Sequence, residues 1–285
     1  YSSLSANTTG ATNVAVGYNS LRLNTTGSDN VAVGELALEN NTTGIRNTAV
    51  GTNALYTKIT GNDNVAVGNA ALYSATNSSN NTAVGANALQ ANTVGDTNTA
   101  VGKDSMKANT TGTNNGAFGS RTLQLNTGGT NNVAVGDLAL GSNTTADENT
   151  AVGVSSLRQN TTGSRNTAFG LNSLTSNLSG SNNNAFGKDA LFYNETGSFN
   201  AAIGDHALLN NISGSFNTAL KGDSLIIGSA ENEINYYFTT GNPVKTQHSG
   251  FSMSGVEGKF YDNDGNFLYG YNQFEQVLIS GNVFS

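Results

Sequence analysis

The stretch NVAVGYNSLRLNTTGSD at residues 13–29 is followed directly by NVAVGELALENNTTGIR at residues 30–46, and this repetition decides the fold. The consensus unit is N-[VT]-A-V-G-x-x-[AS]-L-x-x-N-T-T-G-x-x, and its first asparagine is position 1 of 17. This asparagine recurs without insertion or deletion at Asn13, Asn30, Asn47, Asn64, Asn81, Asn98, Asn115, Asn132, Asn149, Asn166, Asn183, Asn200 and Asn217. A constant period in which every unit adds the same geometric step is typical of a solenoid.

Each segment of the unit predicts a local structure. The run at positions 1–5 favours a short strand, and we expect position 4, such as Val16, to point into a core. The N-T-T-G run at positions 12–15 predicts a turn, because glycine tolerates positive φ. Positions 8–11 fit either a second strand or one helical turn. The sequence therefore predicts an all-β chain, with short helical turns as an option, whose residues 1–225 form a parallel β-solenoid of 17-residue coils.

The uniform asparagine at position 1 favours a structural ladder. Stacked amides would satisfy backbone groups from coil to coil, and we expect this at Asn13, Asn30, Asn47, Asn64, Asn81 and Asn98. The alternative is a polar recognition strip, which would tolerate or require variation. The N-T-T triplets also match the N-glycosylation sequon, although a turn explains them better.

Invariant small residues suggest self-association. Position 3 is alanine in every unit, and position 5 is glycine from Gly17 to Gly204. If position 4 faces the core, both small residues face outward, where solvent does not require them and a packed second chain does. A monomeric solenoid is the alternative. Larger residues towards the end of the array suggest that the core widens there: Phe118, Phe169, Phe186, Ile203 and Leu220 at position 4, and Phe199 and Phe216 at position 17.

Composition excludes several function classes. The net charge of −7 and the absence of any Lys/Arg cluster argue against nucleic acid as a partner. The chain has no cysteine, so disulfides and thiolate metal sites are excluded, and we expect no metal or other cofactor. No apolar run approaches the ~20 residues of a membrane span, so membrane insertion is not expected. Because the sequence begins inside a unit, we expect it to be a piece of a longer chain.

The period ends near Ile226, and residues 226–285 form a segment of different composition. It contains eleven Phe and Tyr residues, as many as residues 1–225 together. Lys259 to Tyr269 predicts a β-hairpin with its turn at Asp264 and Gly265. We also expect a turn at residues 239–243 and a final strand at residues 276–279, which together predict a small β-rich C-terminal tip.

The tip contains the candidate ligand-binding residues. Exposed tyrosines beside polar side chains suit stacking and hydrogen bonding to sugar rings, and the candidates are Tyr236, Tyr237, His248, Tyr261, Asp262, Asp264, Tyr269, Tyr271 and Gln273. The alternative is that the aromatic residues are the tip's own core. A calcium loop at Asp262 and Asp264 lacks the later ligands. We predict no enzyme, since neither His206 nor His248 is flanked by a nucleophile motif, although a glycosidase-like carboxylate pair in the tip stays open.

The motif N-T-A-V-G-x-x-A-L at residues 47–55 and 81–89 resembles repeats of trimeric autotransporter adhesin heads. It is more similar to repeats of trimeric tailed-phage fibres and of the fibre-like adhesins of predatory bacteria. The resemblance implies a homotrimer wound around one axis, on the cell or virion surface or otherwise extracellular, whose distal domain binds surface glycans. Two features depart from it: adhesin-head repeats are usually shorter than 17 residues, and no self-cleaving C-terminal chaperone is visible.

These observations predict a trimeric extracellular fibre or adhesin whose shaft presents the tip to a cell-surface glycan or envelope component. The first alternative is a structural spacer whose C-terminal module only caps the solenoid. The second is a tip enzyme that hydrolyses surface polysaccharide.

Overall fold

The computed structural model describes residues 2–57, 60–220, 226–227, 258–261 and 267–271. These residues contain strands and turns and no helix. They belong to two separate units, a solenoid and a C-terminal hairpin. The all-β prediction is therefore confirmed.

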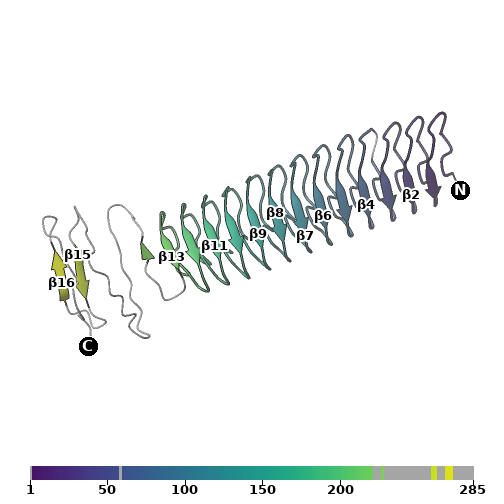
Figure 1. Cartoon of the computed structure of the whole chain (residues 1–285). Helices are drawn as coiled ribbons and strands as arrows, with labels where there is room; N and C mark the ends of the chain where they lie inside the picture. Colours follow the sequence, from purple (N-terminus) through teal and green to yellow (C-terminus); the bar gives the residue numbers. More distant parts are fainter. Residues whose placement is uncertain (1, 58–59, 221–225, 228–257, 262–266, 272–285) are drawn as a thin grey trace. The chain divides into compact units, whose positions relative to one another are not determined.

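Thirteen three-residue strands, one per unit, form a single parallel sheet along the solenoid (Figure 1). They are β1 (Val14–Val16), β2 (Val31–Val33), β3 (Thr48–Val50), β4 (Val65–Val67), β5 (Thr82–Val84), β6 (Thr99–Val101), β7 (Gly116–Phe118), β8 (Val133–Val135), β9 (Thr150–Val152), β10 (Thr167–Phe169), β11 (Asn184–Phe186), β12 (Ala201–Ile203) and β13 (Thr218–Leu220). Each residue pairs with the residue 17 positions further on, as Ala49 does with Ala66. The predicted parallel β-solenoid with 17-residue coils is confirmed.

The last strand of this sheet runs the other way. Strand β14 (Ile226–Ile227) pairs antiparallel with β13, placing Ile227 beside Thr218. An unpaired strand edge is a template for aggregation, and β14 covers part of the edge that β13 presents. The sequence did not predict this strand, because it lies beyond the periodic array.

The interior of each coil is narrow and contains small side chains beside one large one. Alanine at position 3 is fully buried, as at Ala49 and Ala100, and so is leucine at position 9, as at Leu55. Position 4 lies on the opposite face of the strand, and Val50 is 37% exposed. The prediction that position 4 points into the core is wrong. Successive strand residues alternate between faces, and alanine fits opposite the buried leucine.

Positions 8–11 form neither of the two predicted structures. They belong to a series of turns in which positions 7 and 9 adopt left-handed conformations, with φ of 59° at Asn53 and 51° at Leu55. This conformation costs a non-glycine residue on the order of 1–2 kcal/mol. Full burial of the leucine contributes about 1.5–3 kcal/mol, and its backbone N–H donates to Ala71 at 3.0 Å. Burial and hydrogen bonding therefore offset the strain.

Glycine at position 5 is required by the coil itself. Gly85 has a φ of 133°, and a Cβ atom there would lie 2.6 Å from the carbonyl oxygen of Gly102 in the next coil. Both features exclude a side chain. The prediction that the small residue at position 3 faces a second chain is wrong, because this alanine is buried, and the glycine at position 5 is explained inside one chain.

The second unit contains an antiparallel pair of strands. Strand β15 (Gly258–Tyr261) pairs with β16 (Phe267–Tyr271), with Phe260 beside Tyr269. The predicted β-hairpin is confirmed, while its turn at Asp264 and Gly265 lies outside the described residues.

Candidate functional site

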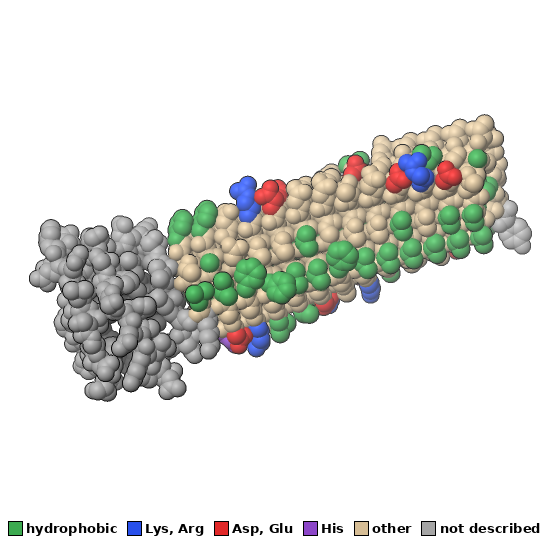
Figure 2. Space-filling model, in the orientation of Figure 1, with side chains coloured by type: hydrophobic (Ala, Val, Ile, Leu, Met, Phe, Trp, Pro, Cys, Tyr) green, Lys and Arg blue, Asp and Glu red, His purple; other side chains and the backbone are tan. Residues whose placement is uncertain are grey.

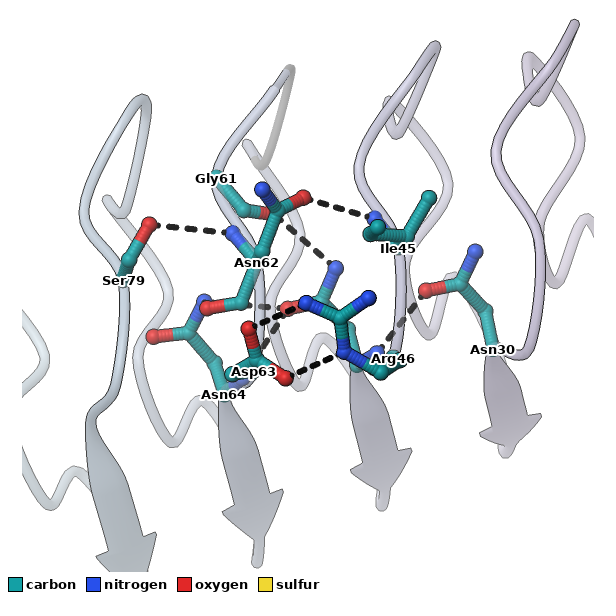
Figure 3. Close-up of polar contacts among 9 residues, drawn as sticks. Asn30, Ile45, Arg46, Gly61, Asn62, Asp63, Asn64 and Ser79 are labelled. Atoms are coloured by element: carbon teal, nitrogen blue, oxygen red, sulfur yellow. Dashed lines mark hydrogen bonds and ion pairs between the residues drawn. The ribbon is translucent and has the colours of Figure 1, made fainter.

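The asparagines at position 1 form a continuous ladder that is buried from Asn30 to Asn200, and Figure 3 shows part of it. The backbone N–H of Asn47 donates to Oδ1 of Asn30 at 2.9 Å, and that of Asn64 donates to Oδ1 of Asn47 at 3.1 Å. The Nδ2 group of Asn47 donates to the carbonyl of Gly61 at 3.0 Å. The same pattern includes Asn13, Asn81 and Asn98. The structural ladder is confirmed. Because these side-chain amides are hydrogen-bonded inside the shaft, they do not form a recognition strip on its surface.

A second buried ladder forms at position 12, where the sequence predicted only a turn. Asn126 donates through Nδ2 to Oδ1 of Asn109 at 2.7 Å and to the carbonyl of Gly129 at 3.1 Å. Both asparagines are fully buried. The sequon asparagine of the N-T-T triplet at Asn109 therefore lies inside the shaft, where glycosylation of the folded chain is sterically excluded. Asparagine recurs at position 12 in every complete unit of the array except those with Lys58 and Ala75, and this recurrence was the sequence signal for the ladder.

Further polar ladders occupy the surface turns. Threonine hydroxyls at position 13 donate to the next coil, as Thr110 does to the carbonyl of Thr127 at 2.9 Å. Side chains at position 16 accept backbone N–H groups of the preceding coil, and Ser79 Oγ accepts from Asn62 at 3.1 Å (Figure 3). Many of the side-chain hydrogen-bond donors and acceptors of the shaft are thus paired between neighbouring coils.

Charged residues occur as pairs between neighbouring coils at position 17. Nε of Arg46 lies 2.6 Å from Oδ1 of Asp63, and Nε of Arg165 lies 2.8 Å from Oε2 of Glu148. The hydrogen bond from Arg46 lowers the pKa of Asp63 and raises that of Arg46. These pairs are exposed to solvent, so each contributes little to stability.

The distinctive surface of the shaft is a row of exposed apolar side chains at position 4 (Figure 2). We call it the outer apolar ladder, and it consists of Val16, Val33, Val50, Val67, Val84, Val101, Phe118, Val135, Val152, Phe169, Phe186, Ile203 and Leu220. Exposure reaches 58% at Val16, 55% at Phe169 and 60% at Leu220, whereas Val84, Val101 and Val152 are half-buried. Position 2, on the same outer face of each strand, holds no charged residue. The expected widening of the core is therefore wrong: these large residues enlarge the outside.

The outer apolar ladder is long enough to be an interface. Thirteen strands spaced by about 4.8 Å extend for roughly 60 Å, and a strip about 10 Å wide has an area on the order of 600 Å². This is the upper end of the range for the largest apolar patch on a soluble monomer, about 300–600 Å², and such patches are often functional. A standard protein interface buries about 800 Å² per partner.

The predicted ligand-binding residues lie in the C-terminal segment, of which the structure describes only the hairpin. Tyr261 ends β15, and Tyr269 and Tyr271 belong to β16, where Tyr271 pairs through its backbone with Gly258. The other candidates lie outside the described residues: Tyr236, Tyr237, His248, Asp262, Asp264 and Gln273. The expected turn at residues 239–243 and strand at residues 276–279 also lie outside them.

The described part of the chain contains few groups that could serve in catalysis or metal binding. His206 lies 3.0 Å from Asp205 and 3.5 Å from Asp189, forming an exposed surface cluster. Within the described residues, no three His, Cys, Asp or Glu side chains gather as metal ligands, and no helix has the length and apolarity to cross a membrane. Comparisons with protein-family models, curated proteins and solved structures returned no match.

Proposed function

We propose that the chain is a fibre protein that associates with two further copies of itself along the outer apolar ladder. The observation that carries this proposal is the apolar side chain at position 4 of all thirteen strands, which is exposed in ten of them and half-buried at Val84, Val101 and Val152. A solvent-facing strand normally alternates apolar and polar residues, with the polar residues outward. Here both faces are apolar at these positions, since alanine is buried and valine or phenylalanine is exposed.

The same features support a second copy of the chain as the occupant. A partner must present an apolar strip that is straight, about 60 Å long and repeated every ~4.8 Å. The chain itself presents such a strip, and the uncharged positions 2 and 4 create no like-charge repulsion when two copies face each other. Three copies are proposed from the resemblance to trimeric fibres, in which the chains share one axis.

The tip is proposed as the recognition element, in an extracellular setting on a cell or virion surface. The shaft repeats one geometry and uses much of its polar capacity internally, so it presents little that distinguishes one ligand from another. Residues 226–285 contain the aromatic and polar side chains that suit a cell-surface glycan or an envelope component. A trimer presents three tips together, which raises avidity by about 10²–10⁴ over a single tip when geometry allows.

Binding to a broad glycan and envelope-polymer panel tests this proposal. The full chain is compared with a Tyr269→Ala variant of the tip and with a Val50→Asp/Val67→Asp variant of the ladder. We expect the tip variant to lose binding and the ladder variant to lose avidity. Absence of any ligand from a folded oligomer would instead support the spacer, and release of shortened polymer would support a tip hydrolase.

A further inference from the structure

The uniform shaft creates a problem of axial register between copies. A shift of one chain by one coil, about 4.8 Å, leaves twelve of the thirteen strands facing strands of nearly identical sequence. Register is weakly specified where a strand surface repeats in this way. A staggered contact also fails to close and continues as an open filament. A finite fibre therefore needs residues that distinguish one coil from another.

Three aromatic residues interrupt the outer apolar ladder, whose other members are valines apart from Ile203 and Leu220. Phe118, Phe169 and Phe186 stand among valines on the ladder and are 44%, 55% and 41% exposed. The valines Val33 and Val135 are 36% and 37% exposed. Because a phenylalanine ring is larger than a valine side chain, a similar exposed fraction means a larger projecting apolar surface.

The spacing of the three phenylalanines distinguishes the correct register from every shifted one. Phe118 and Phe169 are 169 − 118 = 51 residues apart, which is three coils, and Phe169 and Phe186 are one coil apart. Two parallel ladders in register bring all three rings to the levels of their counterparts. A shift by one, three or four coils aligns a single pair, and a shift by two coils aligns none. The three intervals are all different, so at most one aromatic match survives any shift.

The surroundings of Phe118 show that its ring is accommodated on the outside of the shaft. Gly116 is the single glycine at position 2 of the array, and its φ is not positive. A Cβ atom at Gly116 would lie 3.5 Å from Cε2 of Phe118, so the backbone tolerates alanine there. The γ carbons of a valine or threonine would reach further towards the ring. Gly116 therefore leaves space for the Phe118 ring to lie against the sheet.

The other two rings already contact one another within one chain. The centroids of Phe169 and Phe186 lie 6.5 Å apart with an interplanar angle of 24°. In register, the counterparts in a second chain extend this pair into a larger aromatic cluster. In any shifted register at least one of these rings faces a β-branched or other aliphatic residue instead.

We propose that Phe118, Phe169 and Phe186 set the axial register between copies of the chain, an inference that rests on the proposed self-association. Each aromatic pairing between chains that a shift breaks lowers the population of that register by about two- to tenfold. A shift that breaks two of these pairings is therefore disfavoured by about four- to a hundredfold.

Disulfide cross-linking reports the register directly, because the chain has no cysteine of its own. Two differently tagged full-length chains are co-expressed, one with Val67→Cys and the other with either Val67→Cys or Val84→Cys. Disulfides require Cα atoms within about 7 Å, so the 67–67 bond reports the correct register and the 67–84 bond reports a one-coil shift. We expect the 67–67 bond to exceed the 67–84 bond by about tenfold in the otherwise unchanged chain.

Removal of the three rings tests the assignment. In a Phe118→Val/Phe169→Val/Phe186→Val background, the two cross-links should form in nearly equal amounts. The matched control is Phe199→Val/Phe216→Val, which removes two exposed rings away from the ladder and should leave the ratio unchanged. An unchanged ratio in the ladder variant overturns the register proposal and leaves self-association standing. Absence of both cross-links from a folded, unchanged chain contradicts self-association itself.

A shifted pattern provides a positive test. The variant Val101→Phe/Phe118→Val/Val152→Phe/Phe186→Val moves the three-ring pattern by one coil. When it carries Val67→Cys and is co-expressed with an otherwise unchanged chain that carries Val84→Cys, the 67–84 bond should become the dominant mixed product. Continued dominance of the 67–67 bond in the corresponding mixture overturns the proposal.

Discussion

Replacement of Asn98 by alanine tests how the shaft is held together. Oδ1 of Asn98 accepts the backbone N–H of Asn115 at 3.0 Å, and its Nδ2 donates to the carbonyl of Gly112 at 2.8 Å. The side chain is fully buried. The carbonyl of Gly112 keeps a second donor, Nδ2 of Asn109, at 3.1 Å. The substitution also removes the 3.1 Å bond from Nδ2 of Asn115 to Oδ1 of Asn98, but this Nδ2 keeps the carbonyl of Gly129 at 2.8 Å. The backbone N–H of Asn115 is therefore the group left without an acceptor.

The expected loss of stability follows from those hydrogen bonds. An unsatisfied buried N–H costs about 1–3 kcal/mol, and the cavity left by the amide adds to it. We expect Asn98→Ala to lower the free energy of unfolding by about 2–4 kcal/mol. The matched control is Asn69→Ala, since Asn69 is exposed and makes only a 3.5 Å contact with the carbonyl of Thr52. Surface changes of this kind stay within about 0.5 kcal/mol.

Hydrogen exchange locates the effect, because coils of a solenoid interact only with their neighbours. The Asn115 N–H should lose protection, with the loss confined to the coils on either side of residue 98. Guanidinium unfolding of the same variants measures the total change. If Asn98→Ala matches Asn69→Ala in both assays, the buried ladder does not stabilise the shaft as described.

Two further predictions concern the coil and its surface charges. Gly85→Ala should destabilise the shaft by more than about 2 kcal/mol, because alanine is strained at positive φ and its Cβ would lie 2.6 Å from the carbonyl oxygen of Gly102. The control Gly128→Ala should be nearly neutral, because a Cβ atom at residue 128 makes only ordinary van der Waals contact. Thermal unfolding compares the two variants. Asp63→Asn removes the pair with Arg46. Because Arg46 lowers the pKa of Asp63 in the folded chain, the pair stabilises above the unfolded pKa of about 4 and is lost as pH falls through the folded pKa. The melting temperatures of Asp63→Asn and the unchanged chain should therefore differ slightly at pH 7 and converge in acid, and a difference that grows in acid contradicts the pairing.

The sequence predicted the periodic features of the fold well. Stacking of identical units makes every repeated residue a neighbour of its own counterpart, so the period alone predicts the parallel sheet and the ladder at Asn47 and its equivalents. The hairpin of β15 and β16 follows from alternation around a turn, which is a local signal. Strand β14 was not predicted, because it lies outside the periodic array and forms through pairing with β13.

The direction of each side chain was harder to predict. A three-residue strand has one inward and two outward positions, and apolarity alone suggested that Val50 rather than Ala49 points inward. The narrow interior decides otherwise, since Leu55 already fills it and leaves room only for a small neighbour. The sizes of the residues at positions 3, 8 and 9 together indicate which side chain points inward, whereas the apolarity of position 4 does not. The candidate tip residues lie mostly outside the described part of the chain and stay predictions.

The mass of the full chain in solution, measured by light scattering during size-exclusion chromatography, tests the central claim most directly. Matched samples carry Val50→Asp/Val67→Asp on the outer apolar ladder or Val94→Asp, which is 49% exposed away from it. We predict three times the 29.2 kDa chain mass for the unchanged chain and for Val94→Asp, and a folded species of one chain mass for the ladder variant. A folded, unchanged chain that elutes at 29.2 kDa would contradict the assignment of the ladder as an interface.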